Sequence, residues 1–342
     1  MLKHLYWFGT LANLSMEIKI GNRFIGNNHK PFIIAEMSGN HNQSLERALK
    51  LVDAAAQAGA HALKLQTYTA DTMTIKGAFT IEDKNSLWNG KELHDLYKQA
   101  YTPWEWHKAI FDRAKEKKME AFSSPFDETA VDFLESLNVP AYKIASFENT
   151  HHPLLKRVAR TGKPIIISTG VTNRIDIDEA IEVLKKAGCE DIIVLKCTST
   201  YPSTPENTNL LTIPDFINSY NCIVGLSDHT MGVGVSVAAV SLGARVIEKH
   251  FTLSRADGGV DGAFSMEPEE LNSLVIETER AFLSLGEVQY GILPAEEKSL
   301  QFKRSIYVSK DIKTGEILST ENLKIIRPAT GIAPKFWDTI VG

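Results

Sequence analysis

Two lysines lie inside short apolar runs, which is an uncommon place for a charged side chain. Lys64 belongs to the run ALKLQ and Lys143 to the run AYKIAS. Gln66 stands two residues after Lys64, and side chains two apart on a strand share one face. Lysines that project into one cavity together with hydroxyl groups form a site for an anion such as phosphate. Either lysine alone is explained as a solvated strand-end residue, but two of them favour an anion site.

Two histidines stand at the ends of later apolar runs, His229 in GLSDHT and His250 in IEKH. Glu248 shares a strand face with His250. Neutral imidazoles backed by carboxylates suit a divalent transition metal, and two protein ligands leave coordination positions open, as catalysis requires. The alternative is that each histidine is only a polar residue. Glu36 ends the run FIIAE, where it could be a general base or merely a capping or ion-pairing carboxylate.

The elements that must position these side chains alternate along the chain. Eight short apolar runs, from Phe32–Glu36 to Val246–His250, alternate with amphipathic helical patterns, as buried parallel strands and their covering helices do. Eight strand–helix units in roughly 250 residues predict a (β/α)8 TIM barrel, whose functional residues gather at the C-terminal strand ends. An open doubly wound sheet is the alternative, but no G-x-G-x-x-G follows the first strand.

Other segments flank the predicted barrel. Residues 1–15 are expected to be a leader outside the fold, and an N-terminal β-hairpin over Glu17–Phe24 is expected to open a barrel domain spanning 16–286. The polar segment 287–299 is expected to be a linker. Residues 300–342 return to short β-type runs and predict a small β-rich domain, which is short for an independent core.

The composition argues against several classes of function. Of the 342 residues, 43% are hydrophobic and 23% are charged, as in ordinary soluble proteins, and the net charge of −5 argues against nucleic-acid binding. No apolar run is long enough to cross a bilayer. The three cysteines lack C-x-x-C spacing, which argues against a disulfide framework or a zinc ribbon. We therefore expect a cytoplasmic protein that binds neither nucleic acid nor membrane.

Longer motifs point to a known family. The chain resembles the sialic acid synthase (N-acetylneuraminate synthase) family in the order and spacing of the runs IIAEMSGNHN, ALKLQTY, SSPFD, AYKIASFE, ISTG, LKCTSTYP, GLSDHT and IEKHFTLSR. Its C-terminal part resembles the antifreeze-like (SAF) domain of that family, a β-clip, in RSIYVSKDIKTGE and ENLKIIRPATG; the end at Gly342 is expected to leave this domain incomplete. Within the family, AEMSGNHN, SSPFD, ASFE, YTADTMT and FSMEP resemble the branch that makes pseudaminic acid.

This resemblance implies a chemistry and a set of site residues. The reaction would condense phosphoenolpyruvate (PEP) with an amino-sugar aldehyde, 2,4-diacetamido-2,4,6-trideoxy-altrose in the pseudaminic branch, and release phosphate by C–O cleavage. PEP would contact Lys64, Lys143, Ser124, Ser146, Ser168, Ser199 and Ser227, with Gln66 beside them. A divalent metal, Mn2+ before Mg2+ or Co2+, would bind His229 and His250. The sugar would face Glu36, Glu248, Tyr201, Asp261 and, from the SAF domain, Arg327.

Catalysis would then rest on Glu36, Glu248, Lys64 and Lys143. We further expect a domain-swapped homodimer, in which Arg327 completes the active site of the partner subunit. The close alternatives are synthases of N-acetylneuraminate or legionaminate. More remote alternatives are a metal-dependent pyruvate aldolase, which would not need two phosphate-facing lysines, and a carbohydrate-binding protein built around the SAF-like domain.

Overall fold

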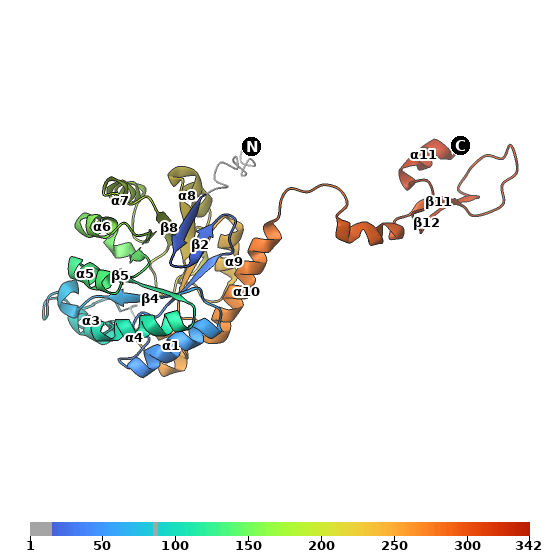
Figure 1. Ribbon diagram of the computed structural model, residues 1–342. Coiled ribbons are helices and arrows are strands. Elements are labelled where there is room, and N and C mark those ends of the chain that lie inside the picture. Colours follow the sequence, from blue (N-terminus) through green and yellow to red (C-terminus); the bar gives the residue numbers. More distant parts are fainter. Residues whose placement is uncertain (1–15, 85–87) are drawn as a thin grey trace. The chain divides into compact units, whose positions relative to one another are not determined.

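Eight parallel strands close into a barrel in a computed structural model that describes residues 16–84 and 88–342 (Figure 1). The predicted leader, 1–15, lies outside the described residues. The strands run around the barrel in the order β10-β3-β4-β5-β6-β7-β8-β9. Their bounds are β3 Phe32–Glu36, β4 Ala62–Thr67, β5 Glu120–Pro125, β6 Tyr142–Ile144, β7 Ile165–Ser168, β8 Ile192–Cys197, β9 Ile223–Ser227 and β10 Val246–His250. The predicted (β/α)8 TIM barrel is therefore confirmed.

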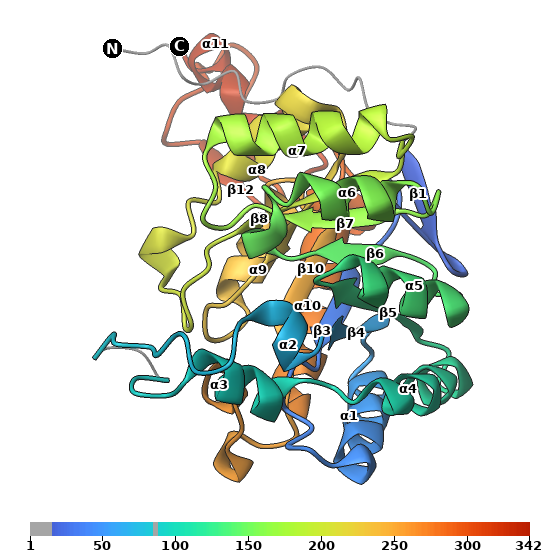
Figure 2. The ribbon, with the colours of Figure 1, turned by 90° about the vertical axis from the view of Figure 1, so that its left-hand side faces the viewer.

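Helices surround the strands, and β6, β7 and β8 lie side by side in Figure 2. The helices that follow successive strands are α1 Leu45–Gln57, α4 Trp104–Glu116, α5 Glu128–Ser136, α6 His152–Ala159, α7 Arg174–Lys186, α8 Thr212–Tyr220, α9 Gly234–Ser241 and α10 Pro268–Leu285. Ser44 caps α1 by accepting a hydrogen bond from the Arg47 amide. Two further helices, α2 Ala70–Met73 and α3 Leu93–Ala100, lie in the connection after β4 and were not expected from the sequence.

The strands are buried on both faces, which explains why they read as continuous apolar runs. Ile165, Ile166 and Ile167 in β7 are at most 1% exposed. Burial of each such side chain contributes about 1.5–3 kcal/mol to folding. The few polar residues inside these strands therefore stand out, because nothing about barrel stability requires them.

The predicted N-terminal hairpin, β1 Glu17–Ile20 and β2 Arg23–Gly26, is present and lies at the start of β5. Its turn residue Gly21 has a φ of +58°, and a Cβ there would collide with the Glu120 carboxylate. Glu120 also accepts a hydrogen bond of 2.8 Å from the Asn22 amide. The hairpin thus lies at the N-terminal end of the barrel, opposite the strand ends that carry the candidate site.

A second unit spans Gly286–Gly342, after the barrel unit that ends at Leu285. It contains the antiparallel pair β11 Ser305–Val308 and β12 Leu323–Ile326, and a short helix, α11 Trp337–Ile340. Its small core includes the buried side chains of Ile306 and Leu323. The 3-10 helix η5, Pro294–Phe302, begins inside the segment 287–299 that the sequence predicts to be a linker. Among the described residues, no helix is long and apolar enough to cross a membrane.

Candidate active site

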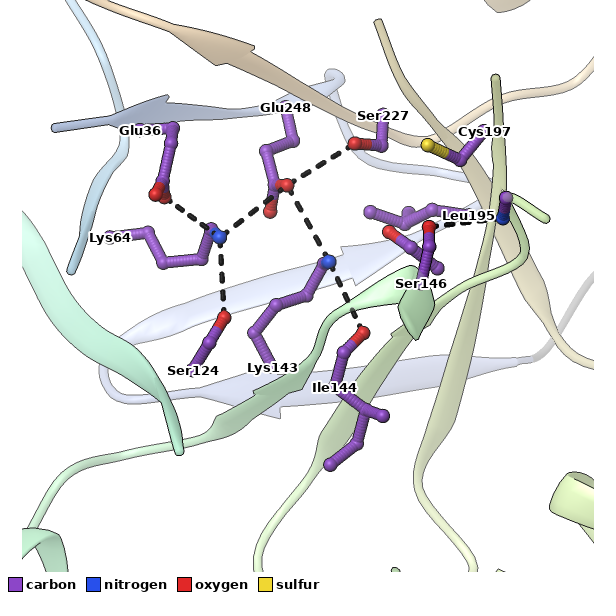
Figure 3. Close-up of polar contacts among 12 residues, drawn as sticks. Glu36, Lys64, Ser124, Lys143, Ile144, Ser146, Leu195, Cys197, Ser227 and Glu248 are labelled. Carbon is purple, nitrogen blue, oxygen red and sulfur yellow. Dashed lines mark hydrogen bonds and ion pairs between the residues drawn. The ribbon is translucent and has the colours of Figure 1, made fainter. Parts of the chain in front are cut away.

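Two lysines and two glutamates meet inside the barrel (Figure 3). The Lys64 Nζ lies 2.8 Å from Glu36 Oε2 and 3.6 Å from Glu248 Oε1. The Lys143 Nζ lies 3.5 Å from the same Glu248 oxygen. Strand register accounts for one pair, since Glu36 on β3 lies directly beside Lys64 on β4. The other pair crosses the barrel, because β10 and β6 lie on opposite sides of the closed sheet.

Burial and mutual attraction set the charges of these four groups, whose side chains are all 7% exposed or less. Burial raises the pKa of Glu36, although Lys64 opposes the rise. Burial would lower the pKa of Lys64, but attraction to Glu248 and Glu36 outweighs it and the pKa is raised. Burial lowers the pKa of Lys143. Burial would also raise the pKa of Glu248, but the two lysines lower it further than burial raises it. Two lysines and two carboxyl groups thus share one buried space, and an anionic ligand would compete with the carboxyl groups for the lysines.

The five predicted serines lie at the ends of strands around the lysines. Ser124 lies in β5, Ser146 begins the 3-10 helix η1 (Ser146–Glu148), Ser168 ends β7, Ser199 follows β8, and Ser227 ends β9. Ser124 accepts a hydrogen bond of 3.3 Å from Lys64, and Ser227 donates one of 3.3 Å to Glu248. The buried Ser168 hydroxyl has no partner among the described residues. Ser124 and Ser227 thus contact the lysine–glutamate cluster, and all five hydroxyls stand at strand ends, where they could donate to an anion.

Gly170 allows two of these hydroxyls to approach the loop after β7. A Cβ at Gly170 would lie 2.1 Å from Ser199 Oγ and 2.8 Å from Ser146 Oγ, so a larger residue would displace both. The Gly170 amide donates to Ser146 Oγ at 3.0 Å. Backbone and hydroxyl donors therefore gather at the ends of neighbouring strands, an arrangement that suits the oxygens of a phosphate or carboxylate.

His229 and His250 lie side by side, with their ring centroids 5.4 Å apart. The His229 Nδ1 lies 2.9 Å from the Thr198 carbonyl oxygen; when this nitrogen donates, Nε2 is left as a free acceptor. The buried His250 Nδ1 has no hydrogen-bond partner within the described residues and lies 3.8 Å from Asp261 Oδ2. Burial holds the pKa of His250 well below its ordinary value, so the ring is neutral at pH 7.

These donors fit a divalent metal. They provide two imidazoles, of which His250 is neutral and has a buried Nδ1 without a partner among the described residues, and a carboxylate close by. Within residues 16–84 and 88–342, no group of three or more His, Cys, Asp and Glu side chains is arranged to hold an ion. The protein would therefore contribute the two-histidine set predicted from the sequence, with open positions for substrate.

A chain of hydrogen bonds connects the histidine side of the site to the lysine side. Ser38 donates to Asp261 Oδ2 and accepts a bond of 3.2 Å from Gln66 Nε2. Gln66 also donates to Glu36 Oε1 at 2.9 Å. Burial raises the pKa of Asp261, and the Ser38 hydrogen bond opposes the rise. These predicted sugar-facing residues and Gln66 thus form one continuous polar wall.

Aromatic rings form the wall beside the histidines. The Tyr201 ring centroid lies 4.4 Å from that of His229 and 5.2 Å from that of Phe264. Phe264 in turn lies 5.1 Å from His250. Burial raises the pKa of Tyr201, so its hydroxyl stays protonated at neutral pH. Arg327 is the one predicted site residue that belongs to the second unit, where it is exposed just after β12.

Sequence reasoning did not select Glu148, which ends η1. Burial raises its pKa to about 7, and attraction to Lys143 opposes the rise. Its Oε2 is buried without a hydrogen-bond partner among the described residues. The sequence feature that could have identified Glu148 is its position in ASFE, two residues after Ser146 and just beyond the end of a buried strand. Glu148 is therefore a further acid at the strand ends.

Comparison with known proteins identifies the family. The NeuB family matches residues 51–290, and the SAF domain matches residues 303–342. A pseudaminic acid synthase of Campylobacter jejuni is 44% identical over 331 residues, which cover 95% of this chain and 94% of the relative. An N,N'-diacetyllegionaminic acid synthase of the same organism is 36% identical, covering 92% of this chain and 95% of the relative.

Solved structures agree with this assignment. The crystal structure of an N-acetylneuraminic acid synthetase from Leptospira borgpetersenii, in complex with citrate, matches with a TM-score of 0.76 and 33% identity, covering 85% of this chain and 97% of that one. The chain belongs to the NeuB family and carries a C-terminal SAF domain. The family resemblance drawn from the strand-end motifs is therefore confirmed.

Proposed function

We propose that this chain is a pseudaminic acid synthase, which condenses PEP with 2,4-diacetamido-2,4,6-trideoxy-altrose. The observation that carries the proposal is the pair of buried lysines, Lys64 and Lys143, which face Glu36 and Glu248 inside the barrel. The similarity to the C. jejuni pseudaminic acid synthase supports this choice of sugar.

PEP binds where the lysines and the strand-end hydroxyls converge. Its phosphate and carboxylate oxygens accept hydrogen bonds from Lys64 and Lys143, strengthened by charge. Ser124, Ser146, Ser168, Ser199 and Ser227 add neutral donors. Because Glu36 and Glu248 lose their lysine partners when PEP arrives, both become available to accept protons, or hydrogen bonds from sugar hydroxyls.

The sugar lies on the histidine side, against Tyr201, Asp261 and Gln66. A divalent ion held by His229 and His250, most simply Mn2+, with Mg2+ or Co2+ as alternatives, would polarise the sugar aldehyde as a Lewis acid. The Thr198 carbonyl orients His229, and burial keeps His250 neutral, so both rings present nitrogen lone pairs.

The reaction proceeds by addition and elimination. C3 of PEP attacks the aldehyde carbon, the aldehyde oxygen takes up a proton, and water adds at C2. The resulting tetrahedral intermediate breaks its C2–O bond and releases inorganic phosphate, leaving a 2-keto acid. The lysines stabilise the phosphate charge from binding to departure.

The proposal includes a dimer in which the second unit of each chain reaches the barrel of the other. Exposed apolar side chains stand in the segments that follow the strands, including Phe147, Val171 and Met231, which are 50–66% exposed. The second unit likewise exposes Ile317 and Ile332. Apolar surface on both units favours association, and a two-fold dimer is the commonest closed arrangement. Arg327 would then contact the sugar in the partner's site.

We place the reaction in the cytoplasm, since all three cysteines are unpaired and that compartment keeps thiols reduced. The decisive experiment incubates the full chain with PEP, Mn2+ and each candidate amino sugar, measures phosphate release and identifies the product by mass spectrometry. Preferential use of N-acetylmannosamine or of the legionaminate precursor would assign a neighbouring activity. Condensation of pyruvate without phosphate release would assign an aldolase, and sugar binding without turnover a binding protein.

A further inference from the structure

A second buried ion pair lies directly behind the two histidines. The Lys249 Nζ is 3.0 Å from Asp228 Oδ2, and the two side chains are 2% and 0% exposed. Asp228 immediately precedes His229, and Lys249 immediately precedes His250. Since side chains alternate between the faces of a strand, Lys249 points to the face opposite that of Glu248 and His250. The ion pair therefore lies outside the barrel lumen, beneath the covering helices.

Each polar atom of this pair has a partner. Lys249 also donates to the carbonyl oxygens of Thr230 at 2.6 Å and Gly232 at 3.0 Å. Asp228 Oδ1 accepts from the amide and hydroxyl of Thr230 at 2.9 and 2.7 Å. Asp228 Oδ2 accepts from the Ser236 hydroxyl of α9 at 2.6 Å. The Asp228–Lys249 pair thus connects the end of β10, the loop that carries His229, and α9.

The stability of the fold does not by itself explain a buried ion pair behind the two histidines. Well-packed apolar residues of similar volume are often as stabilising as a buried ion pair, because two charges must first lose their hydration. What the pair provides is a defined geometry. It joins the residue before one histidine to the residue before the other, across two adjacent strands. Outer groups of this kind orient metal ligands and tune their affinity.

We propose that Asp228 and Lys249 are positioning residues that fix His229 relative to His250 and thereby set the affinity of the site for a divalent ion. The inference rests on the proposed metal-dependent function. Neither residue needs to touch substrate. Their effect reaches the ion through the backbone on which the two histidines are carried.

The test measures Mn2+ binding directly, without turnover. The full-length wild type and Lys249→Met are titrated with Mn2+, and the free ion is followed by electron paramagnetic resonance. PEP affinity is measured separately without metal. The matched control is Lys163→Met, which removes a partly buried ion pair of 2.7 Å with Glu135 at the N-terminal end of β7. Ser236→Ala is a milder variant that removes one hydrogen bond to Asp228.

We expect Lys249→Met to raise the Kd for Mn2+ about tenfold to a hundredfold and Ser236→Ala to raise it a few-fold. PEP affinity should stay within about twofold of wild type, and Lys163→Met should bind Mn2+ normally. Should Lys249→Met fail to fold, Ser236→Ala decides the question. Wild-type Mn2+ affinity in the folded variants, or equal losses of Mn2+ and PEP affinity, would overturn the inference. A wild-type protein that binds no Mn2+ would refute the metal in the proposed function itself, which is a separate result.

Discussion

Replacement of Glu148 by glutamine should change how the stability of the protein depends on pH. The substitution keeps the size and shape of the side chain and removes its ionisation. In the folded protein burial raises the pKa of Glu148 from 4.5 to about 7. A raised carboxyl pKa means that the folded state holds the proton more tightly than the unfolded state. The stabilisation is complete below the unfolded pKa and is lost as the pH rises through the folded one.

The size of the effect follows from the shift. A change of roughly 2.5 pKa units corresponds to about 3 kcal/mol of unfolding free energy. Relative to Glu148→Gln, the wild type should therefore lose about 3 kcal/mol between pH 4.5 and pH 8, with most of the loss between pH 5 and pH 7. Other titrating groups contribute equally to both proteins and cancel in the difference.

The assay is urea unfolding followed by circular dichroism at several pH values, for the wild type, Glu148→Gln and the exposed control Glu287→Gln. As the pH rises, the unfolding free energy of the wild type should fall relative to that of Glu148→Gln, while the control should follow the wild type. Parallel pH profiles for the wild type and Glu148→Gln would refute the reasoning, because they would mean that Glu148 ionises equally in the folded and unfolded states.

Four further predictions concern the reaction. Lys64→Ala and Lys143→Ala should each lose about 1.5–3 kcal/mol of transition-state binding, about tenfold or more in kcat/KM for PEP, with less effect on the sugar; wild-type kinetics in either variant would return that lysine to a structural role. Exhaustive chelation should abolish activity, and Mn2+ or Co2+ should restore it; full activity in metal-free protein would contradict the metal site. Oxygen-18 in the bridging C2–O position of PEP should appear in phosphate, whereas label in the sugar acid would exclude C–O cleavage. Arg327→Ala and His250→Ala chains, each nearly inactive alone, should recover up to about a quarter of wild-type activity when they exchange subunits; no recovery in proven heterodimers would contradict the swapped arrangement.

The sequence was sufficient to predict the barrel because burial on both faces leaves a local signature. β3 and β10 have the bounds read from the apolar runs Phe32–Glu36 and Val246–His250. The helices between the strands followed from their periodicity and caps. Elements without a sustained apolar pattern could not be read this way. Examples are α2 and α3 in the loop after β4 and η5 within the expected linker, since such segments depend on contacts outside their own window.

Sequence also determined which chemical groups reach the strand ends, since the order of residues along a strand decides which side chains share a face. It placed Lys64 with Gln66, and Glu248 with His250. Only the closed barrel brought Glu248 between Lys64 and Lys143, buried the carboxyl of Glu148, and joined Asp228 to Lys249 behind the histidines. These contacts join residues from different strands. Their distances depend on strand tilt, register and closure, which are properties of the whole sheet that no local stretch of sequence contains.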